Sequence, residues 1–410
     1  MIGTSKRSEN FTIFLAAFIN SLGGIGIDLY APSIPAIGRA LHTSQAVMLS
    51  TITVFLVAYA LGQLFFGLFS DTKGRKPAVL TGLFAFIVGS VLATQAHRIE
   101  TLMIARALQG FAIGSCQVVA RAMLVDNFKG DRFRVAIIYL SLAFGLGPVI
   151  APYIGGLVED SVGWRWNFAI YCVYGFTVLL FVLFGMRESL DVSKRQTPRY
   201  ALLGYGEILS SREFLLSVIL LGGSFSAFLM WNILGPYLIQ VKLGHSASFF
   251  GTTALICGTS YLLGTLINRV VAPRFKSMPI MKSGILLFFL GVVCMIVSGS
   301  GVQIYLIMAG VILVAFAQGF IFSQCDGTIY GYIRPSGQRC RQFARLPDVG
   351  DRVDLLGTGK PCADRLRVSD RGDIWVPAGH RSFGTAALEQ SPHDSPFLKS
   401  RRESGNTEKD

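Results

Sequence analysis

Long apolar runs alternate with short polar segments along the chain as far as Phe322. A helix needs about 20 mostly apolar residues to cross a bilayer, and isolated strands cannot satisfy their backbone hydrogen bonds in lipid. The pattern therefore predicts ten membrane-spanning helices. They are residues 11–35, 46–69, 78–96, 101–125, 133–157, 167–186, 214–240, 248–270, 280–299 and 303–323.

The longest polar connection between these helices begins at Arg187 and ends at Glu213, so it separates six helices from four. We predict an N-terminal half at residues 1–186, a cytoplasmic linker at 187–213 and an incomplete C-terminal half at 214–323. A shift of about two hundred positions aligns glycine and proline positions of one half with those of the other. Gly62, Pro77 and Gly82 align in this way with Gly264, Pro279 and Gly284. The repeat favours two parallel halves, which is a common transporter design.

The chain changes character after Phe322. Residues 324–410 contain no apolar run that could cross a bilayer, and arginine dominates their basic residues. So little apolar surface cannot offset chain entropy, and we predict a polar, disordered cytoplasmic tail. A second half matching the first would need two further helices here, which leaves two interpretations: a soluble extension, or a reading frame that departs from that of an ancestral transporter. The abrupt change, at the point where a helix is due, favours the second.

The composition is that of a membrane protein. Hydrophobic residues make up 52% of the chain and charged residues 15%, whereas soluble domains carry about 25% charged residues. The formal net charge of +13 could suggest a nucleic-acid partner. However, the basic residues lie in short loops between apolar runs, and no basic–aromatic patch stands out. With the N-terminus inside, the outer loops hold only Arg39, Arg98, Arg165 and Lys242. This asymmetry predicts a cytoplasmic N-terminus and no nucleic-acid partner.

The reactive residue types do not form a recognisable catalytic or metal site. Four cysteines lie inside apolar runs, where a lone thiol is usually a small hydrophobic residue, and three others lack the paired spacing of a zinc site. The seven are Cys116, Cys172, Cys257, Cys294, Cys325, Cys340 and Cys362. No catalytic triad or phosphate loop stands out. The sequence therefore predicts no enzyme, no metal and no cofactor.

One short loop is unusually rich in charge. The stretch GLFSDTKGRKPAVL, residues 67–80, lies between two apolar runs. Ordinary positive-inside charge explains its basic residues but not its acid or its glycines. Asp71 can form charge-assisted bonds with Arg75 and Lys76 that hold the cytoplasmic helix ends in one state and release them in another. Gly67 and Gly74 allow close helix approach and a tight turn. We predict that these five residues form a cytoplasmic gate.

Two ionisable residues lie within apolar runs. Asp28 is near the outer end of the first predicted helix, and a carboxylate at membrane depth is expensive to ionise. It is a candidate proton acceptor or substrate-attracting group, although an interfacial acid at a helix end is the alternative. Arg106 lies in TLMIARALQGFAIGSC and must face a polar cavity or a partner. Its repeat counterpart near Ala315 is apolar, so the arginine is not a packing feature of both halves. Gln109, one turn along, is a candidate hydrogen-bond partner.

Two further segments suggest packing and binding roles. Glycines and prolines punctuate the predicted helix at 133–157, which should be kinked and closely packed on a neighbour, although a merely irregular helix is the alternative. These residues are Gly145, Gly147, Pro148, Pro152, Gly155 and Gly156. In FLMWNILGPYLIQ, the side chains of Trp231, Asn232 and Tyr237 could line a cavity for amphiphilic substrates. Tyr237 could equally be an interfacial anchor.

Four stretches together resemble the major facilitator superfamily. GLFSDTKGRKPAVL looks like its loop signature G-x-x-x-D-x-x-G-R-[RK], and LMIARALQGFAIGS resembles its fourth-helix motif R-x-x-Q-G. GLGPVIAPYIGG, residues 145–156, resembles the fifth-helix motif of its proton-driven antiporters. DLYAPSIPAI, residues 28–37, is similar to the end of the first helix in bacterial drug exporters of the bicyclomycin and chloramphenicol resistance type. The resemblance covers about residues 10–323.

This resemblance implies an all-α bundle with two pseudo-repeated halves, of which ten helices are readable here instead of the family's twelve. It implies that Arg106 couples proton movement to substrate exchange, and that the packing of the fifth helix resists leakage. We therefore predict a proton-coupled multidrug exporter, a monomer in the bacterial inner membrane, with the lipid bilayer, protons and a small amphiphilic compound as its partners. The alternatives are an inactive or regulatory remnant of such a transporter, and a uniporter for a small polar nutrient.

Overall fold

The computed structural model describes residues 6–190 and 212–333, except 273, 276 and 299–302, together with 367–368 and 374–375. The chain divides into two units, Met1–Arg334 and Pro335–Asp410. In the second unit, the described residues form two short strands, β1 (Arg367–Val368) and β2 (Ile374–Trp375), which pair antiparallel. The rest of the predicted tail beyond residue 333, and residues 191–211 of the predicted linker, lie outside the described residues.

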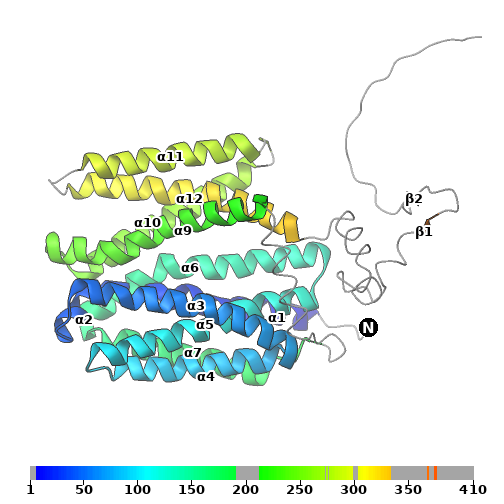
Figure 1. Cartoon of the computed structure of the whole chain (residues 1–410), viewed down its shortest axis with the longest axis horizontal. Coiled ribbons are helices and arrows are strands. Elements are labelled where there is room, and N and C mark those ends of the chain that lie inside the picture. The colour runs from blue at the N-terminus through cyan, green and yellow to red at the C-terminus, as the bar shows by residue number, and fades with distance from the viewer. Residues whose placement is uncertain are drawn as a thin grey trace, which may run out of the picture. The chain divides into compact units, whose positions relative to one another are not determined.

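The first unit consists of two groups of long helices that run back and forth along one direction (Figure 1). The N-terminal group contains α1 (Lys6–Asp28), the 3-10 helix η1 (Ala31–Ser33), α2 (Ile34–Ala40), α3 (Gln45–Lys73), α4 (Arg75–Thr94), α5 (Ile99–Asn127), α6 (Gly130–Val162) and α7 (Arg165–Gly185). The C-terminal group contains α9 (Arg212–Pro236), the π-helix η3 (Tyr237–Lys242), α10 (Ala247–Val271), α11 (Ser277–Val297) and α12 (Ile304–Ile333).

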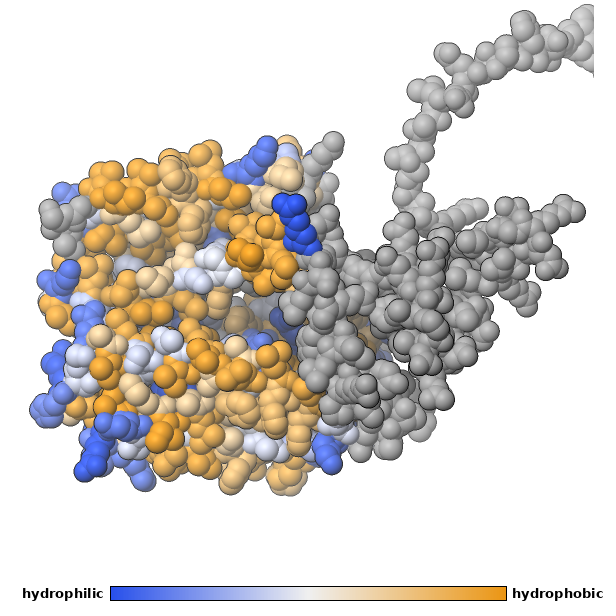
Figure 2. Space-filling view, viewed as in Figure 1, coloured by the Kyte–Doolittle hydropathy of each residue, from blue (hydrophilic) through white to orange (hydrophobic). Residues whose placement is uncertain are grey.

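Ten helical spans among the described residues are long and apolar enough to cross a membrane. Large apolar side chains point outward from them: Phe184 is 81% exposed, Ile219 68% and Phe289 63%. Figure 2 shows hydrophobic residues over most of the visible face of the helical unit, with hydrophilic residues mainly near its left and right edges. A water-soluble surface rarely exposes so much continuous apolar area. The predicted all-α membrane fold is therefore confirmed.

Several helices extend beyond the predicted spans. Helix α3 continues to Lys73, α4 begins at Arg75, and α12 continues to Ile333 rather than ending at residue 323. The prediction counted only the apolar residues needed to cross hydrocarbon, whereas a helix can continue into water as long as its backbone remains paired. The charged loop of the sequence analysis is consequently a one-residue break at Gly74 between two long helices.

The internal repeat is visible in the way the helices pack. Gly62 of α3 lies against the backbone carbonyl of Phe111 in α5, and Gly264 of α10 lies against the backbone carbonyl of Phe316 in α12. A side chain at either glycine would collide with the facing backbone, so both helix pairs depend on glycine for their close approach. Gly62 and Gly264 are two of the positions that the sequence repeat aligned.

The two groups meet mainly where α6 packs on α10. A Cβ atom at Gly156 would lie 2.5 Å from the carbonyl oxygen of Ala247, and one at Gly258 would lie 2.7 Å from a Cγ atom of Val149. Gly145, nearer the start of α6, has open space around it. The groups are therefore in close contact toward the end where α6 finishes and α10 begins. In the predicted orientation this end faces outward.

Candidate transport site

The buried carboxylate of Asp28 joins the two helix groups. Asp28 is the last residue of α1 and is only 2% exposed, and Asn232 of α9 is 4% exposed. The Nδ2 atom of Asn232 donates a hydrogen bond of 2.7 Å to Oδ1 of Asp28. The structure thus brings together two predicted site residues that are far apart in the sequence. The alternative, an acid at the lipid interface, does not fit this burial.

The local sequence explains why α1 ends at Asp28. Tyr30 follows in a turn, and Pro32 and Pro35 begin the short helices η1 and α2. Proline lacks a backbone donor and cannot continue a preceding helix. The chain therefore breaks inside the bundle and restarts, which leaves Asp28 at a helix C-terminus. The partial negative charge at such an end does not stabilise a carboxylate, so Asp28 depends on its side-chain neighbours.

Arg106 of α5 is completely buried near the end of α1. Its Nη1 atom donates to the carbonyl oxygen of Gly26 at 3.3 Å and to Oε1 of Gln109 at 3.0 Å. Its guanidinium lies 4.0 Å from the ring centre of Phe55 and 4.2 Å from that of Tyr30. Aromatic faces attract a cation most strongly when water is excluded. The protein therefore surrounds this charge with π-faces rather than with a carboxylate.

Among the described residues, two donors of Arg106 have no hydrogen-bond partner. These are its buried Nε and Nη2 atoms, and in the same part of the chain no ion pair joins the guanidinium to Asp28. The Asp28 carboxylate nevertheless interacts electrostatically with this guanidinium. An unsatisfied buried charge is costly. Arg106 can therefore still bind an acceptor, either water or part of a ligand.

Polar side chains around Arg106 and the end of α1 hold both in position. Gln109 links Arg106 to α4, because its Nε2 atom donates to Oγ of Ser90 at 2.9 Å. The hydroxyl of Tyr171 in α7 donates to the carbonyl oxygens of Ile25 and Gly26 at 3.1 Å each. Gln109 is therefore better placed to orient Arg106 than to touch a ligand. Ser90 and Tyr171 could not be singled out in the sequence, because a serine or tyrosine within an apolar run carries no distinctive signal.

The other two predicted binding residues of this segment flank Asn232 in the sequence, Trp231 directly before it and Tyr237 five residues after it. Trp231 packs against Phe250, with ring centres 6.1 Å apart, and its buried indole N–H has no hydrogen-bond partner among the described residues. Tyr237 is half-buried at the start of η3. Neither forms a hydrogen bond or ring contact with Asp28 or Arg106 in the part of the chain that the structure describes. Their role in binding stays a prediction.

Three further hydrogen bonds fasten the groups at the same end as Asp28. Gln240 donates to the carbonyl oxygen of Pro32 at 2.6 Å. The carboxylate of Asp160, near the end of α6, accepts from the backbone N–H groups of Ala247 at 3.2 Å and Ser248 at 2.8 Å. These N–H groups belong to the first turn of α10, where a negative charge also stabilises the helix dipole. This end of the bundle is therefore closed.

Helix α6 packs on both groups through its predicted glycines. A Cβ at Gly147 would lie 2.5 Å from the backbone of Gly24 in α1, and Gly155 meets the carbonyl oxygen of Leu29. Gly156 faces α10, as described above. Pro148 and Pro152 lie within this helix, which runs unbroken from Gly130 to Val162. Gly145 makes no such close approach.

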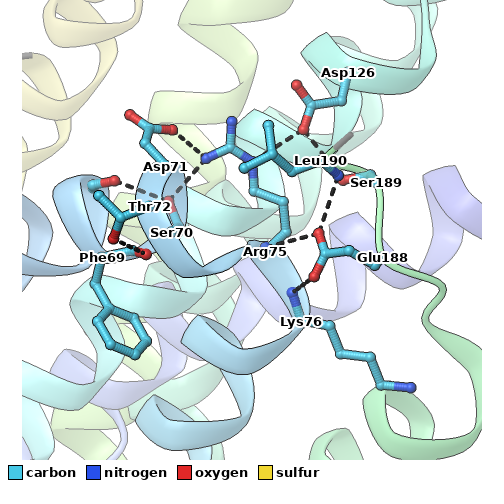
Figure 3. A network of polar contacts seen from close by, with 11 residues as sticks. Phe69, Ser70, Asp71, Thr72, Arg75, Lys76, Asp126, Glu188, Ser189 and Leu190 are labelled. Atoms are coloured by element: carbon cyan, nitrogen blue, oxygen red, sulfur yellow. Dashed lines mark hydrogen bonds and ion pairs between the residues drawn. The ribbon is translucent and has the colours of Figure 1, made fainter. Parts of the chain in front are cut away.

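At the opposite end, Arg75 is the centre of a polar network (Figure 3). Its Nη1 atom donates to Asp71 and to Oγ of Ser70, the latter at 2.9 Å, and its Nε atom donates to Asp126 at 3.0 Å. Gly74 has a φ of +116°, a conformation that favours glycine and gives the tight turn that was predicted. The network therefore joins α3, α4 and α5, all within the N-terminal group.

Lys76 and Gly67 take a smaller part in this network than the sequence suggested. The Nζ atom of Lys76 donates to the carbonyl oxygen of Leu183 at 2.8 Å rather than to Asp71. The carbonyl oxygen of Gly67 accepts from Oγ of Ser70 within the same helix, at 3.0 Å. The acid–base pairing of the predicted gate is therefore made by Arg75.

Glu188 completes the network and was not singled out in the sequence. Its carboxylate accepts from the backbone N–H groups of Arg75 at 2.9 Å and Lys76 at 3.0 Å, which are unpaired donors at the start of α4. Partial burial raises the pKa of Glu188, but backbone N–H groups, including those of Leu190, Arg75 and Lys76, outweigh it, so that pKa is below its ordinary value. Glu188 thereby ties the segment after α7 to the start of α4.

These observations define a class: a multi-pass helical membrane protein in which two groups of helices meet around a buried acid and a buried arginine. The sequence profile of the Major Facilitator Superfamily matches residues 13–336. The chain therefore belongs to the Major Facilitator Superfamily, as the motifs suggested. That family consists of membrane transporters rather than enzymes.

Curated relatives are similar at moderate identity. The uncharacterized MFS-type transporter YdgK of Bacillus subtilis is 29% identical over 62% of this chain and 64% of its own length. The multidrug resistance protein MdtL of Klebsiella pneumoniae (strain 342) is 34% identical over 53% of this chain and 56% of its own length. MdtL of Vibrio parahaemolyticus is 28% identical over 86% of each chain. The chain thus spans less than two thirds of the length of the first two relatives.

Solved transporters share the fold. The inward-facing, unoccupied structure of a bacterial homolog of the human lysosomal transporter Spinster has a TM-score of 0.62 and 16% identity, covering 80% of this chain and 79% of that one. The partially occluded inward-open structure of the xylose transporter XylE from E. coli has a TM-score of 0.62 and 13% identity, covering 79% of this chain and 84% of that one. At such identities the likeness concerns the fold.

Proposed function

We propose that the protein is a proton-coupled exporter of small hydrophobic or amphiphilic compounds that works by alternating access. The observation that carries this proposal is the hydrogen bond between Asp28 and Asn232, because it places an ionisable group at the contact between the two helix groups. The multidrug resistance proteins among the relatives support the class of substrate.

The coupling follows from competition for one carboxylate. Ionised Asp28 accepts a charge-assisted bond from Asn232, which is about twice as strong as a bond to a neutral group. A proton on Asp28, or a polar group of a substrate bound to it, replaces or weakens that bond. The same carboxylate cannot hold the proton and the substrate together. Proton entry and substrate exit therefore alternate, and each changes how firmly the outer end is closed.

Arg106 tunes this exchange from beside the carboxylate. Its positive charge favours the ionised form of Asp28, which helps the proton to leave on the cytoplasmic side. Its two unpaired donors can also bind an acceptor on the substrate. Gln109 holds the guanidinium in place, and Trp231 and Tyr237 supply aromatic surface along the path that an amphiphile takes.

The remaining parts of the proposal concern the gate and the setting. The Arg75 network steadies the cytoplasmic ends of α3, α4 and α5 while the two groups rock against each other. We place the protein as a monomer in the bacterial inner membrane, with its N-terminus and the residues after α12 in the cytosol. The halves are residues 1–186 and 214–323, joined by a cytoplasmic linker at 187–213.

Reconstituted vesicles test the function. Efflux of ethidium, a fluorescent amphiphilic cation, is measured with and without an imposed pH gradient. We expect the gradient to accelerate efflux by the full chain, and Asp28→Asn to remove this acceleration. Glu100→Gln, a matched change at an exposed acid on α5, should leave it intact. Efflux that is independent of the gradient, or gradient-driven efflux by Asp28→Asn, would exclude proton coupling through Asp28.

A further inference from the structure

A cavity lies on the surface of the N-terminal group, between α1, α6 and α7. Its volume is about 420 Å³, within the range of small-molecule sites, and its wall is almost entirely apolar. Its lining includes Phe14 and Ala17 of α1, Ala143 and Leu146 of α6, and Tyr174 of α7. Phe14 is 52% exposed and Leu146 39% exposed. The cavity therefore opens to the side, where the bilayer would be.

The chemistry of the wall selects a hydrocarbon chain. Its polar side chains are Ser21 and Tyr174, whose hydroxyls are 2.6 Å apart, and Ser21 donates to the carbonyl oxygen of Phe18 at 2.8 Å, so both hydroxyls are paired. A bound drug needs a few polar groups that fix its orientation, and this wall offers none that is free. The lining runs along α1 from Phe14 and ends at Leu29, one residue past the end of the helix, which is about 22 Å at 1.5 Å per residue. One leaflet of hydrocarbon is about 15 Å deep, so a lipid tail fits within this length.

Charge distinguishes the two ends of the cavity. Arg7 precedes Phe14 by seven residues and Arg132 precedes Ala143 by eleven, and both spacings return to the same helix face. Both arginines are exposed, and Arg132 also pairs with Glu9 across α1 and α6 at 3.4 Å, its side chain remaining 46% exposed. Basic side chains at this level attract anionic lipid headgroups.

The other end of the cavity does not offer such a site. There α6 ends in the acids Glu159 and Asp160, which would repel a phosphate. Arg165, at the start of α7, is already engaged, because it donates to the carbonyl oxygen of Ala96 and stacks on Trp164. The end where α1 begins offers Arg7 and Arg132 against Glu9, whereas this end offers Arg165 against Glu159 and Asp160, so an anionic headgroup is favoured where α1 begins.

We propose that this cavity holds one acyl chain of an anionic phospholipid, whose headgroup lies at the level of Arg7 and Arg132 in the leaflet where α1 begins. The lipid covers the open seam between α1, α6 and α7 and supports α6, the helix on which both groups pack. The site is separate from Asp28, and it does not depend on which compound the protein exports.

Retention of lipid by the purified full chain tests whether an acyl chain occupies the apolar cavity. The protein is mixed with phosphatidylglycerol or with phosphatidylcholine of the same acyl chains, and bound lipid is counted by native mass spectrometry. Ala143→Phe, which fills the cavity, should abolish retention of one phosphatidylglycerol. Val173→Phe, which adds the same ring at a 67% exposed position of α7, should not. Ala17→Phe fills the cavity from α1 if Ala143→Phe does not yield monodisperse protein. Full retention by a monodisperse filled variant would overturn the proposal.

The preference for an anionic over a zwitterionic headgroup tests the role of the arginines. Arg132→Gln should lower the preference for phosphatidylglycerol over phosphatidylcholine by about fivefold, the value expected for one basic group near an anionic headgroup. Arg98→Gln, the same change at an exposed residue at the opposite end of the bundle, should leave the preference unchanged. Equal effects of the two variants, equal retention of both lipids, or displacement of the lipid by ethidium would each contradict an anionic-lipid site.

Discussion

Replacing Asn232 by leucine isolates the contact on which the proposed coupling rests. The change removes the donor to Asp28 while keeping a side chain of similar size. A hydrogen bond to a charged group contributes about 1.5–3 kcal/mol, and its loss leaves a buried carboxylate without that partner. Because the bond joins the two helix groups, its loss should shift the balance toward states with an open outer end by about 10- to 150-fold.

Spin labels at two exposed residues of the closed end report this shift. Arg39 of α2 and Lys242 of η3 are replaced by labelled cysteines in a background without native cysteines, and electron–electron double resonance measures their separation. The wild-type background should give a short distance, and Asn232→Leu should add a longer one.

A double-mutant cycle decides whether the effect passes through the carboxylate. Asp28→Asn mimics the protonated side chain, and in this background Asn232→Leu should produce a much smaller shift. An unchanged distance distribution in Asn232→Leu, or the same shift with and without the Asp28 carboxylate, would show that this hydrogen bond does not hold the outer end closed.

Three further predictions concern packing and the cytoplasmic network. Gly155→Val should lower the melting temperature in detergent, because overpacking a close backbone contact costs about 1–3 kcal/mol, whereas Gly145→Val, in open space, should have little effect; equal losses would show that helix contact is not the cause. Glu188→Gln should destabilise the protein at neutral pH, and the difference should vanish as pH falls through the lowered pKa of Glu188, below its ordinary value of 4.5; a difference that grows in acid would have the wrong sign. Arg75→Lys should slow efflux while changing the melting temperature little, because a single ammonium cannot reproduce the planar fork that binds two carboxylates. Efflux at the wild-type rate would show that Arg75 is not part of the gate.

The sequence was sufficient for the fold because lipid leaves few choices. A run of about 20 apolar residues must be a helix in a bilayer, so the ten spans could be read by length alone. Asp28 and Arg106 could be singled out for the same reason, since a charge within such a run must have a function or a buried partner. Their burial at 2% and 0% exposure agrees with that reasoning.

The pairing of the site residues could not be read in the same way. Asp28 and Asn232 lie in different helix groups, and no local pattern specifies which amide approaches the carboxylate. Glu188 looks like an ordinary acid after a helix, and only the three-dimensional arrangement shows that it caps α4. Gly145 and Gly147 are equivalent in the motif, yet only Gly147 faces a neighbouring backbone. Side-chain direction around a helix depends on packing that the motif does not record.

Proton release on substrate binding is the direct test of whether proton and substrate compete for Asp28. Purified protein in weakly buffered detergent solution is mixed with ethidium, and a pH indicator records protons released per bound substrate across a range of pH. If they compete, the wild type should release protons wherever Asp28 is protonated without substrate, Glu100→Gln should release equally many, and Asp28→Asn should release none. Substrate binding without proton release, or undiminished release by Asp28→Asn, would contradict competition for this carboxylate.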